Sequence, residues 1–292
     1  MMFDINQLEW DDIMLNELNI PKSILPKVQP SCSHFGDYEM DGHHIPIVAI
    51  MGDQQAALFG QACFSPGSSK NTYGTGCFML VNTGEKPKVS QNGLLTTIAW
   101  GIDGAAIQWL RDALQIIETS EETETLAKEV ADDHSVYFVP AFVGLGAPHW
   151  DMYARGSIFG LTRDTGKAHI AKATLEALAF QTKDMIRAMQ KDAGFKISAL
   201  HVDGGACNND YLMQFQANIL NRDVIKPQNI QSTVMGVAYM AGIYLKWWNQ
   251  GEIDQTRKIG KVYRPDMPKE MRKKRYRVWK KAVKRSMAWL ED

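Results

Sequence analysis

The stretch IPIVAIMGDQQAALFGQACFSPGSSKNTYGTGCFML, residues 45–80, carries the strongest structural signals in this 292-residue chain. It opens with an apolar run typical of a buried strand, and Asp53 follows where a helix of small residues over 54–61 begins. In open α/β sheets ligands bind at the carboxyl ends of strands, and helix N-termini favour negative charge. The stretch therefore predicts an α/β fold with Asp53 at a ligand-binding edge.

A glycine-rich turn follows in the same stretch. A strand predicted over 70–73 leads into Gly74-Thr75-Gly76 and then into a strand over 77–81. Glycine lets the backbone bend tightly and approach an anion closely. An acid beside such a turn suits phosphoryl transfer, although each feature also has a simpler explanation. Asp53 fits an ordinary helix N-cap, and the turn fits an ordinary hairpin.

We expect residues 47–52 and 93–100 to add strands to the same sheet, and residues 31–44, with three histidines, to form an exposed loop. A second strand-turn-helix signal lies later in the chain. A buried strand over 197–203 ends in Gly204-Gly205, and a helix is predicted over 209–220. This arrangement indicates a second phosphate- or adenosine-binding turn, although a Gly-Gly pair alone is a weak signal.

The composition excludes several classes of protein. The chain has 45% hydrophobic residues, a net charge of −1 and four cysteines without metal or redox spacing. Nothing in it favours nucleic acid, and no apolar run approaches the roughly 20 residues of a membrane span. The basic tail over 266–292 contains an apolar stripe, so we interpret it as an amphipathic helix rather than a nucleic-acid site.

The strings GDQQAALFGQ (52–61) and NTYGTGCFML (71–80) closely resemble the glycerol kinases of the FGGY carbohydrate kinase family. The resemblance implies a ribonuclease H-like domain of the actin-like ATPase fold, with a mixed sheet flanked by helices and a C-terminal helical extension. It covers the second domain of that family, so we expect the first domain to be absent. The implied division is a lead-in helix and loop over 1–44, the ribonuclease H-like domain over 45–265 and an amphipathic basic helix over 266–292.

The resemblance also implies roles for particular residues, with ATP and magnesium as cofactors. Asp53 would take the proton of the substrate hydroxyl and reach magnesium through water. Gln54 and Phe78, together with Asp53, match contacts to glycerol. The matches to nucleotide contacts are Thr75, Gly104, Gln108, Gly205 and Asn209.

The chain departs from the family pattern in one place. The family has a further strand between the positions matched by Gly104 and Ala105, and this chain lacks it. Losing a strand exposes a sheet edge or forces its neighbours to pair anew. A helix is expected directly afterwards, over 105–117, and it carries Gln108.

The implied reaction transfers the γ-phosphate of ATP to glycerol and needs two domains that close around the substrates. We therefore expect little or no activity from this chain alone, and a separate first-domain polypeptide is a possible partner. The family also implies a homo-oligomer, and the four cysteines without metal or redox spacing indicate reduced thiols and a cytoplasmic location. The alternatives are a truncated, non-catalytic remnant with residual nucleotide affinity and an interaction module that keeps the fold.

Overall fold

The computed structural model describes residues 2–73, 76–84, 87–96, 102–103, 115–117 and 119–290, and the structural statements below refer to these residues. At the centre lies a six-stranded sheet in the order β12-β11-β10-β5-β6-β7. Its strands are β5 (Ser69–Tyr73), β6 (Gly76–Val81), β7 (Ile102–Asp103), β10 (Ala199–Asp203), β11 (Asp223–Pro227) and β12 (Ile259–Tyr263). The strands predicted over 70–73, 77–81 and 197–203 are confirmed.

The sheet is mixed, as predicted. Strand β10 pairs in parallel with both β5 and β11, whereas β5/β6, β6/β7 and β11/β12 are antiparallel pairs. Asp203, the last residue of β10, lies opposite Thr72 of β5. Because the two strands run in the same direction, their carboxyl ends lie at the same edge of the sheet.

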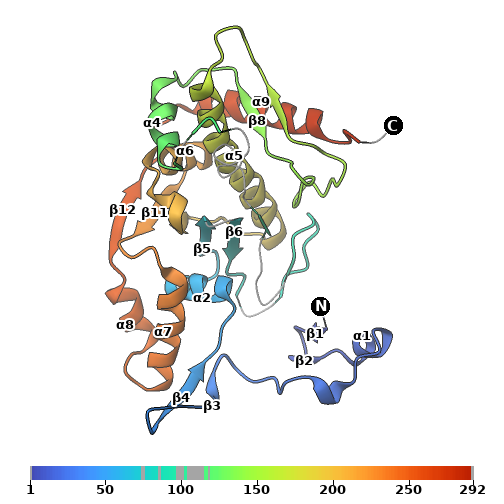
Figure 1. Ribbon diagram of the computed structural model, residues 1–292, viewed down its shortest axis with the longest axis vertical. Coiled ribbons are helices and arrows are strands. Elements are labelled where there is room, and N and C mark those ends of the chain that lie inside the picture. The colour runs from blue at the N-terminus through green and yellow to red at the C-terminus, as the bar shows by residue number, and fades with distance from the viewer. Residues whose placement is uncertain are drawn as a thin grey trace.

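Helices cover both faces of the sheet (Figure 1). On one face lie α2 (Asp53–Gly60) and α7 (Ser232–Tyr244), which pack against each other, with α8 (Gln250–Thr256) beside them. On the other face lie α5 (Lys167–Ala193) and α6 (Asp210–Leu220). The helices α4 (Glu122–Glu129) and α9 (Lys269–Ser286) pack outside α5 and α6.

The main core fills the space between the sheet and the α5 side. The helix predicted over 165–193 is α5, and Gly194 ends it in the left-handed conformation, with φ 76°. Phe180 of α5 stacks on Trp279 of α9, with ring centroids 5.2 Å apart. Trp279 is buried, whereas most cationic side chains of α9 are exposed, which confirms the amphipathic C-terminal helix.

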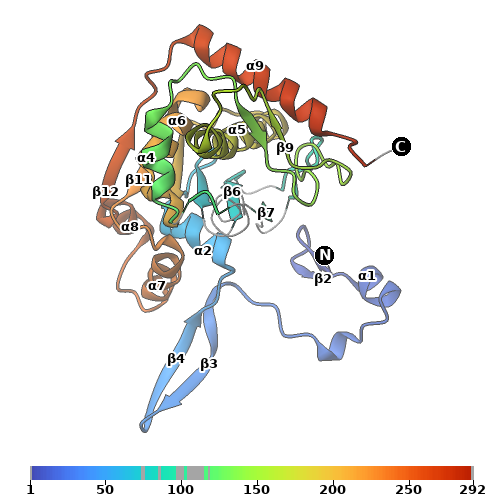
Figure 2. The same cartoon turned by 45° about the horizontal axis from the view of Figure 1, so that its top comes forward.

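The N-terminal segment stands apart from the central sheet and corrects two predictions. The predicted loop over 31–44 is mostly strand, because β3 (Cys32–Met40) and β4 (His43–Ala49) form a hairpin. Asp41 and Gly42 connect the strands with φ of 50° and 75°, as the Asp-Gly signature of a tight hairpin turn requires. The strand predicted at 47–52 as part of the main sheet is therefore wrong, since β4 pairs with β3 and is mostly exposed. The hairpin projects away from the sheet (Figure 2).

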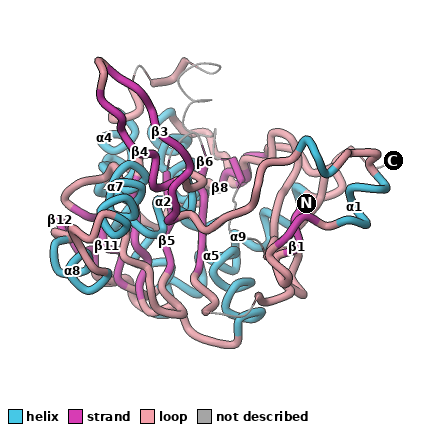
Figure 3. Tube along the Cα trace, turned by 90° about the horizontal axis from the view of Figure 1, so that it is seen from below, coloured by secondary structure: helices cyan, strands magenta, loops and turns pink. Residues whose placement is uncertain are grey.

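The remaining elements are short. Figure 3 shows that the elements preceding the hairpin in the sequence lie to one side of the central sheet. A second hairpin covers the outer side of α5. The bounds are β1 (Phe3–Asp4), β2 (Glu9–Trp10), α1 (Asp12–Glu17), η1 (Lys22–Ile24), β8 (Tyr137–Val139) and β9 (Ser157–Phe159).

Two predicted elements lie largely outside the described residues. No strand is present over 93–96, the described part of the strand predicted over 93–100. Of the helix predicted over 105–117, only residues 115–117 are described, and they are not helical.

The contact between α2 and α7 leaves no room for side chains. A Cβ on Gly236 of α7 would lie 1.8 Å from the carbonyl oxygen of Ala56 in α2, and one on Gly60 would lie 2.1 Å from the carbonyl oxygen of Ser232. The small residues of α7 were predicted to allow close packing, and they pack directly against α2. The close contact fixes α2, which begins at Asp53, against the rest of the domain.

We predict that Gly236→Ala lowers the free energy of unfolding by about 3 kcal/mol or more, because neither backbone can yield without moving a helix. Urea unfolding followed by circular dichroism measures this change. Gly166→Ala is the control, since its Cβ would meet no atom within 4 Å, and we expect a change within about 1 kcal/mol. Equal stability of Gly236→Ala and the wild type would contradict the tight helix contact.

Candidate functional site

Asp53 is the first residue of α2 and follows Gly52 at the helix N-cap. Its side chain is exposed, so it opens outward instead of being sealed in the core. One carboxylate oxygen, Oδ1, accepts a hydrogen bond from the backbone N–H of Gln54 at 2.8 Å. The other, Oδ2, accepts from Nε2 of the Gln54 side chain at 3.1 Å. The helix start and its neighbour thus orient the carboxylate.

Gln54 lies beneath Asp53 and is only 4% exposed. Its Nε2 donates to Asp53, and its Oε1 accepts a hydrogen bond from the ammonium of Lys70. Both ends of the amide are therefore engaged by neighbouring side chains. Asp53 and Gln54, both predicted to contact glycerol, are hydrogen-bonded to each other, and the buried Lys70 ammonium lies behind them.

Lys70 lies in β5 and is fully buried. Besides Gln54, its Nζ donates to Thr72 Oγ1 at 2.7 Å. Burial lowers the pKa of Lys70 from 10.5 to about 8, while the nearby Asp203 and Asp53 carboxylates favour its charged form. Sequence reasoning missed this residue. Its signal was the alternation in β5, which puts Lys70 and Thr72 on one face of the strand.

Asp203 ends β10 next to this cluster and is 1% exposed. Burial raises the pKa of its carboxyl group, although Thr72 and the Lys70 charge oppose that shift. Nε2 of Gln61 lies 3.4 Å from Asp203 Oδ2 and donates to Ser232 Oγ at 2.9 Å. Asp203 is thus a second buried charged group below the end of the strands.

Phe78 lies on the same face of the sheet. In the β5/β6 pair it stands opposite Thr72. Residues directly opposite in an antiparallel pair project from the same face, so Phe78 shares the α2 side with Thr72 and Lys70. Its ring is half-buried. The structure therefore brings Asp53, Gln54 and Phe78 to one face of the domain.

The Gly204-Gly205 turn lies against the end of β5. Gly204 has φ 85°, and a Cβ there would lie 2.3 Å from the carbonyl oxygen of Tyr73. Only glycine fits this contact and this backbone conformation. Gly205 is exposed and begins the short helix η2 (Gly205–Asn208). The turn after β10 and the last described residue of β5 before the glycine-rich turn are thus in contact.

Asn209 is the N-cap of α6. Its Oδ1 accepts from the backbone N–H of Leu212 at 2.9 Å, and its Nδ2 donates to Thr123 Oγ1 of α4 at 3.2 Å. The amide is therefore engaged within the protein. A nucleotide contact through Nδ2 would use its second N–H, since only one is donated to Thr123.

Three predicted nucleotide contacts, Thr75, Gly104 and Gln108, lie outside the described residues. The structure thus positions five of the predicted site residues in two groups. The first group surrounds Asp53 on the α2 side, and the second is the turn from Gly205 to Asn209. The pairing of β5 with β10 connects the two groups.

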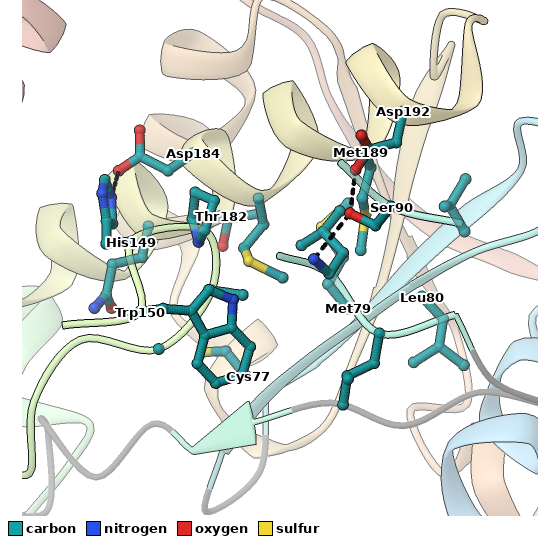
Figure 4. Close-up of a pocket in the computed structure, with 18 of the residues that line it drawn as sticks. Cys77, Met79, Leu80, Ser90, His149, Trp150, Thr182, Asp184, Met189 and Asp192 are labelled. Carbon is teal, nitrogen blue, oxygen red and sulfur yellow. Dashed lines mark hydrogen bonds and ion pairs between the residues drawn. The ribbon is translucent and has the colours of Figure 1, made fainter. Parts of the chain in front are cut away.

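A cavity of about 260 Å³ lies on the opposite face of the sheet (Figure 4). Cys77 and Met79 of β6 line it together with Thr182 and Met189 of α5. Its carboxylates have partners within the protein, since His149 points toward Asp184 and the Ser90 hydroxyl toward Asp192, as Figure 4 shows. Asp53 does not line it. We place the candidate site on the α2 side because the residues predicted to bind and deprotonate the substrate lie there.

Membrane-spanning helices and clusters of metal ligands are both absent from the described part of the chain. No described helix is long and apolar enough to cross a membrane. No group of three or more His, Cys, Asp or Glu side chains with metal-binding geometry occurs among the described residues.

The mixed sheet with helices on both faces and the Gly204-Gly205 turn at the end of β10 define a domain of the actin-like ATPase fold. Residues 69–245 match the C-terminal domain of the FGGY family of carbohydrate kinases, and residues 1–60 match its N-terminal domain. The chain belongs to this family. The N-terminal match extends from the segment before the projecting hairpin through the hairpin to the end of α2, so it includes Asp53. This corrects in part the expectation that the first domain is absent.

The curated relatives include the glycerol kinases of Caldanaerobacter subterraneus and Halorhodospira halophila, each 54% identical over 100% and 99% of this chain. Among solved structures, Plasmodium falciparum glycerol kinase with ADP has a TM-score of 0.89 at 35% identity and covers 98% of the chain. The gluconate kinase of Lactobacillus acidophilus, at 23% identity, covers 97% with a TM-score of 0.82 and supports the fold.

The chain spans about 60% of the length of these relatives, between 60% and 62%. The match to the Caldanaerobacter enzyme runs over 309 positions, 17 more than the 292 residues of the chain. At least 17 positions of the relative therefore have no counterpart here. This agrees with an internal shortening, while the predicted loss of one strand before residue 105 stays a prediction.

We predict that Lys70→Met changes how stability depends on pH. The folded pKa of about 8 lies below the unfolded value of 10.5, so the unfolded state binds more protons between these values. Below pH 8 the buried ammonium therefore lowers the free energy of unfolding of the wild type. This destabilisation is lost as the pH rises to 10.5, because the buried amine is then neutral. Relative to the variant, the wild type gains about 3 kcal/mol across this window. Urea unfolding from pH 7 to 10.5 measures it, and a constant difference would contradict a buried charged amine.

Proposed function

We propose that this chain contributes the Asp53 half of a glycerol kinase site, which transfers the γ-phosphate of ATP to glycerol. The observation that supports it most is the exposed Asp53 carboxylate, oriented by Gln54 and backed by the buried Lys70. Relatives 54% identical over the chain are glycerol kinases. Because the chain spans about 60% of their length, the complete activity requires the remaining part, in the same polypeptide or in a second one.

Asp53 acts as the base in this proposal. A carboxylate only accepts hydrogen bonds when ionised, and Asp53 uses each oxygen once toward Gln54. Lone pairs remain on both oxygens for the hydroxyl of glycerol. The carboxylate aligns that hydroxyl and takes its proton as the bond to phosphorus forms. The half-buried ring of Phe78, on the same face, covers the carbon atoms of the substrate.

The residues also fit a magnesium ion. This ion is commonly held by one or two carboxylates together with phosphate oxygens and several waters. The exposed Asp53 carboxylate meets that requirement through a bridging water. Bound there with ATP, the ion would neutralise charge on the phosphates.

The Gly204-Gly205 turn serves the nucleotide in this proposal. Its exposed backbone and the start of α6 lie at the same sheet edge as the end of β5. Gly205 and Asn209 contact the nucleoside part, and Thr75, Gly104 and Gln108 complete the set. A related solved structure, the Plasmodium falciparum glycerol kinase, contains ADP. A cytoplasmic location and a homo-oligomer belong to the same proposal.

A second candidate is a non-catalytic remnant or interaction module. The observation that favours it is the absence of counterparts for at least 17 positions of the Caldanaerobacter enzyme. A domain that retains its core and loses part of its nucleotide-binding surface can still fold and assemble with a partner.

The test supplies the missing part in trans. The purified chain is mixed with the part of the Caldanaerobacter enzyme that lies outside the match, and glycerol 3-phosphate formation is measured with magnesium and ATP. We expect background rates from each part alone and glycerol-dependent turnover from the mixture. Asp53→Asn should lower that turnover about 10²- to 10⁴-fold because it removes the base.

Asp254→Asn is the matched control, since Asp254 is an exposed acid on α8, and we expect an unchanged rate. A mixture that associates but makes no product supports the non-catalytic alternative. Full activity of the Asp53→Asn mixture would refute the role of Asp53.

A further inference from the structure

The contact between Lys70 and Gln54 fixes which end of the Gln54 amide faces the site. An ammonium only donates hydrogen bonds, so the amide atom beside Lys70 Nζ must be the oxygen. The NH₂ group consequently faces Asp53, whose carboxylate only accepts. Two charged groups of opposite sign thus specify one orientation of an amide that otherwise has two similar ones.

Lys70 is itself held in one place. Thr72 Oγ1 accepts its second hydrogen bond at 2.7 Å, and the side chain is fully buried between β5 and α2. The charged groups that face it are Asp203 from β10 and Asp53 from α2. No carboxylate pairs with it directly among the described residues. Its ammonium therefore directs its hydrogen bonds to Gln54 and Thr72.

Packing alone does not explain this lysine. Removing an ammonium from water costs free energy, and an apolar side chain of similar volume commonly suits such a position better. The lowered pKa of Lys70 reflects that cost. Residues that reduce stability in this way are concentrated at functional sites.

We propose that Lys70 is a positioning residue, which holds the Gln54 amide so that its NH₂ group orients the Asp53 carboxylate toward the substrate hydroxyl. The inference rests on the proposed function and assigns a residue to it. It also defines the chemistry of Gln54. Because Oε1 is directed toward Lys70, the group that Gln54 presents beside Asp53 is its remaining N–H, and a hydroxyl that meets this N–H accepts.

The test observes Gln54 directly in the full 292-residue chain. Proton exchange of the Gln54 side-chain NH₂ with water is measured by nuclear magnetic resonance, and Gln54→Ala identifies the signal by its loss. We expect slow exchange in the wild type and at least tenfold faster exchange in Lys70→Met. Thr72→Val, which removes the second acceptor of Lys70, should give an intermediate rate and tests the same link by a milder change.

Lys183→Met is the matched control. Lys183 is another largely buried amine, with a pKa lowered to about 8, and it donates to the carbonyl oxygen of Ile219 at 2.5 Å on the far face of the sheet. Its removal should leave Gln54 exchange within twofold of the wild type. Unchanged exchange in folded Lys70→Met, or equal acceleration in Lys183→Met, would overturn the positioning role.

The same variants in the mixed kinase assay separate this inference from the proposed function. We expect Lys70→Met to lower kcat about tenfold with little change in the KM for ATP, and Lys183→Met to match the wild type. An inactive wild-type mixture, with the Gln54 difference retained, contradicts the proposed function and not the link from Lys70 to Asp53. Unchanged kcat in Lys70→Met contradicts the positioning role.

Discussion

The parallel pairing of β5 with β10 is the constraint on which the candidate site depends. It places Asp203 opposite Thr72, so that the carboxyl ends of both strands lie at one edge of the sheet. The Gly204 backbone then lies directly against Tyr73, in a contact that only glycine permits. The helix α2, fixed against α7 by glycine contacts, brings Asp53 to the same side. The strand order and these close backbone contacts thus position Asp53 at the start of α2.

The polar groups below that edge oppose stability and favour a defined geometry. Lys70 and Asp203 are both buried, and burial shifts the pKa of each toward its neutral form. A domain built for stability alone would fill these positions with apolar side chains. Here the charge of Lys70 orients an amide, and that amide orients an exposed carboxylate. Local departures from good packing rules are expected where a protein performs chemistry.

Much of the fold was predictable from the sequence, for identifiable reasons. Strong local signals mark the long periodic segment over 165–193 and the strand-turn-helix around Gly204. The elements predicted from both signals are present in the structure. The hairpin β3–β4 was missed, although its Asp41-Gly42 turn was visible, because a run rich in apolar residues was assigned to the buried sheet. Pattern alone does not distinguish a strand of the central sheet from one that pairs in a projecting hairpin.

The candidate site was predicted in part. Asp53, Gln54 and Phe78, which the resemblance assigned to glycerol, share one face. Lys70 was not predicted, because a lysine in a strand is normally exposed and its partner on α2 is 16 residues away. The bonds of Asn209 within the protein were also unforeseen, since they depend on Thr123, which is 86 residues away in sequence.

The central claim is that Asp53 and the Gly204-Gly205 turn border one nucleotide and substrate site at the edge of the sheet where β5 and β10 end. Chemical-shift mapping of the ¹⁵N-labelled chain with magnesium and ADP tests it most directly. The account predicts shifts at Gly205, Asn209 and the start of α2, with none at Met189 in the cavity on the far face. Shifts confined to that cavity, or no shifts at millimolar ADP, would contradict it.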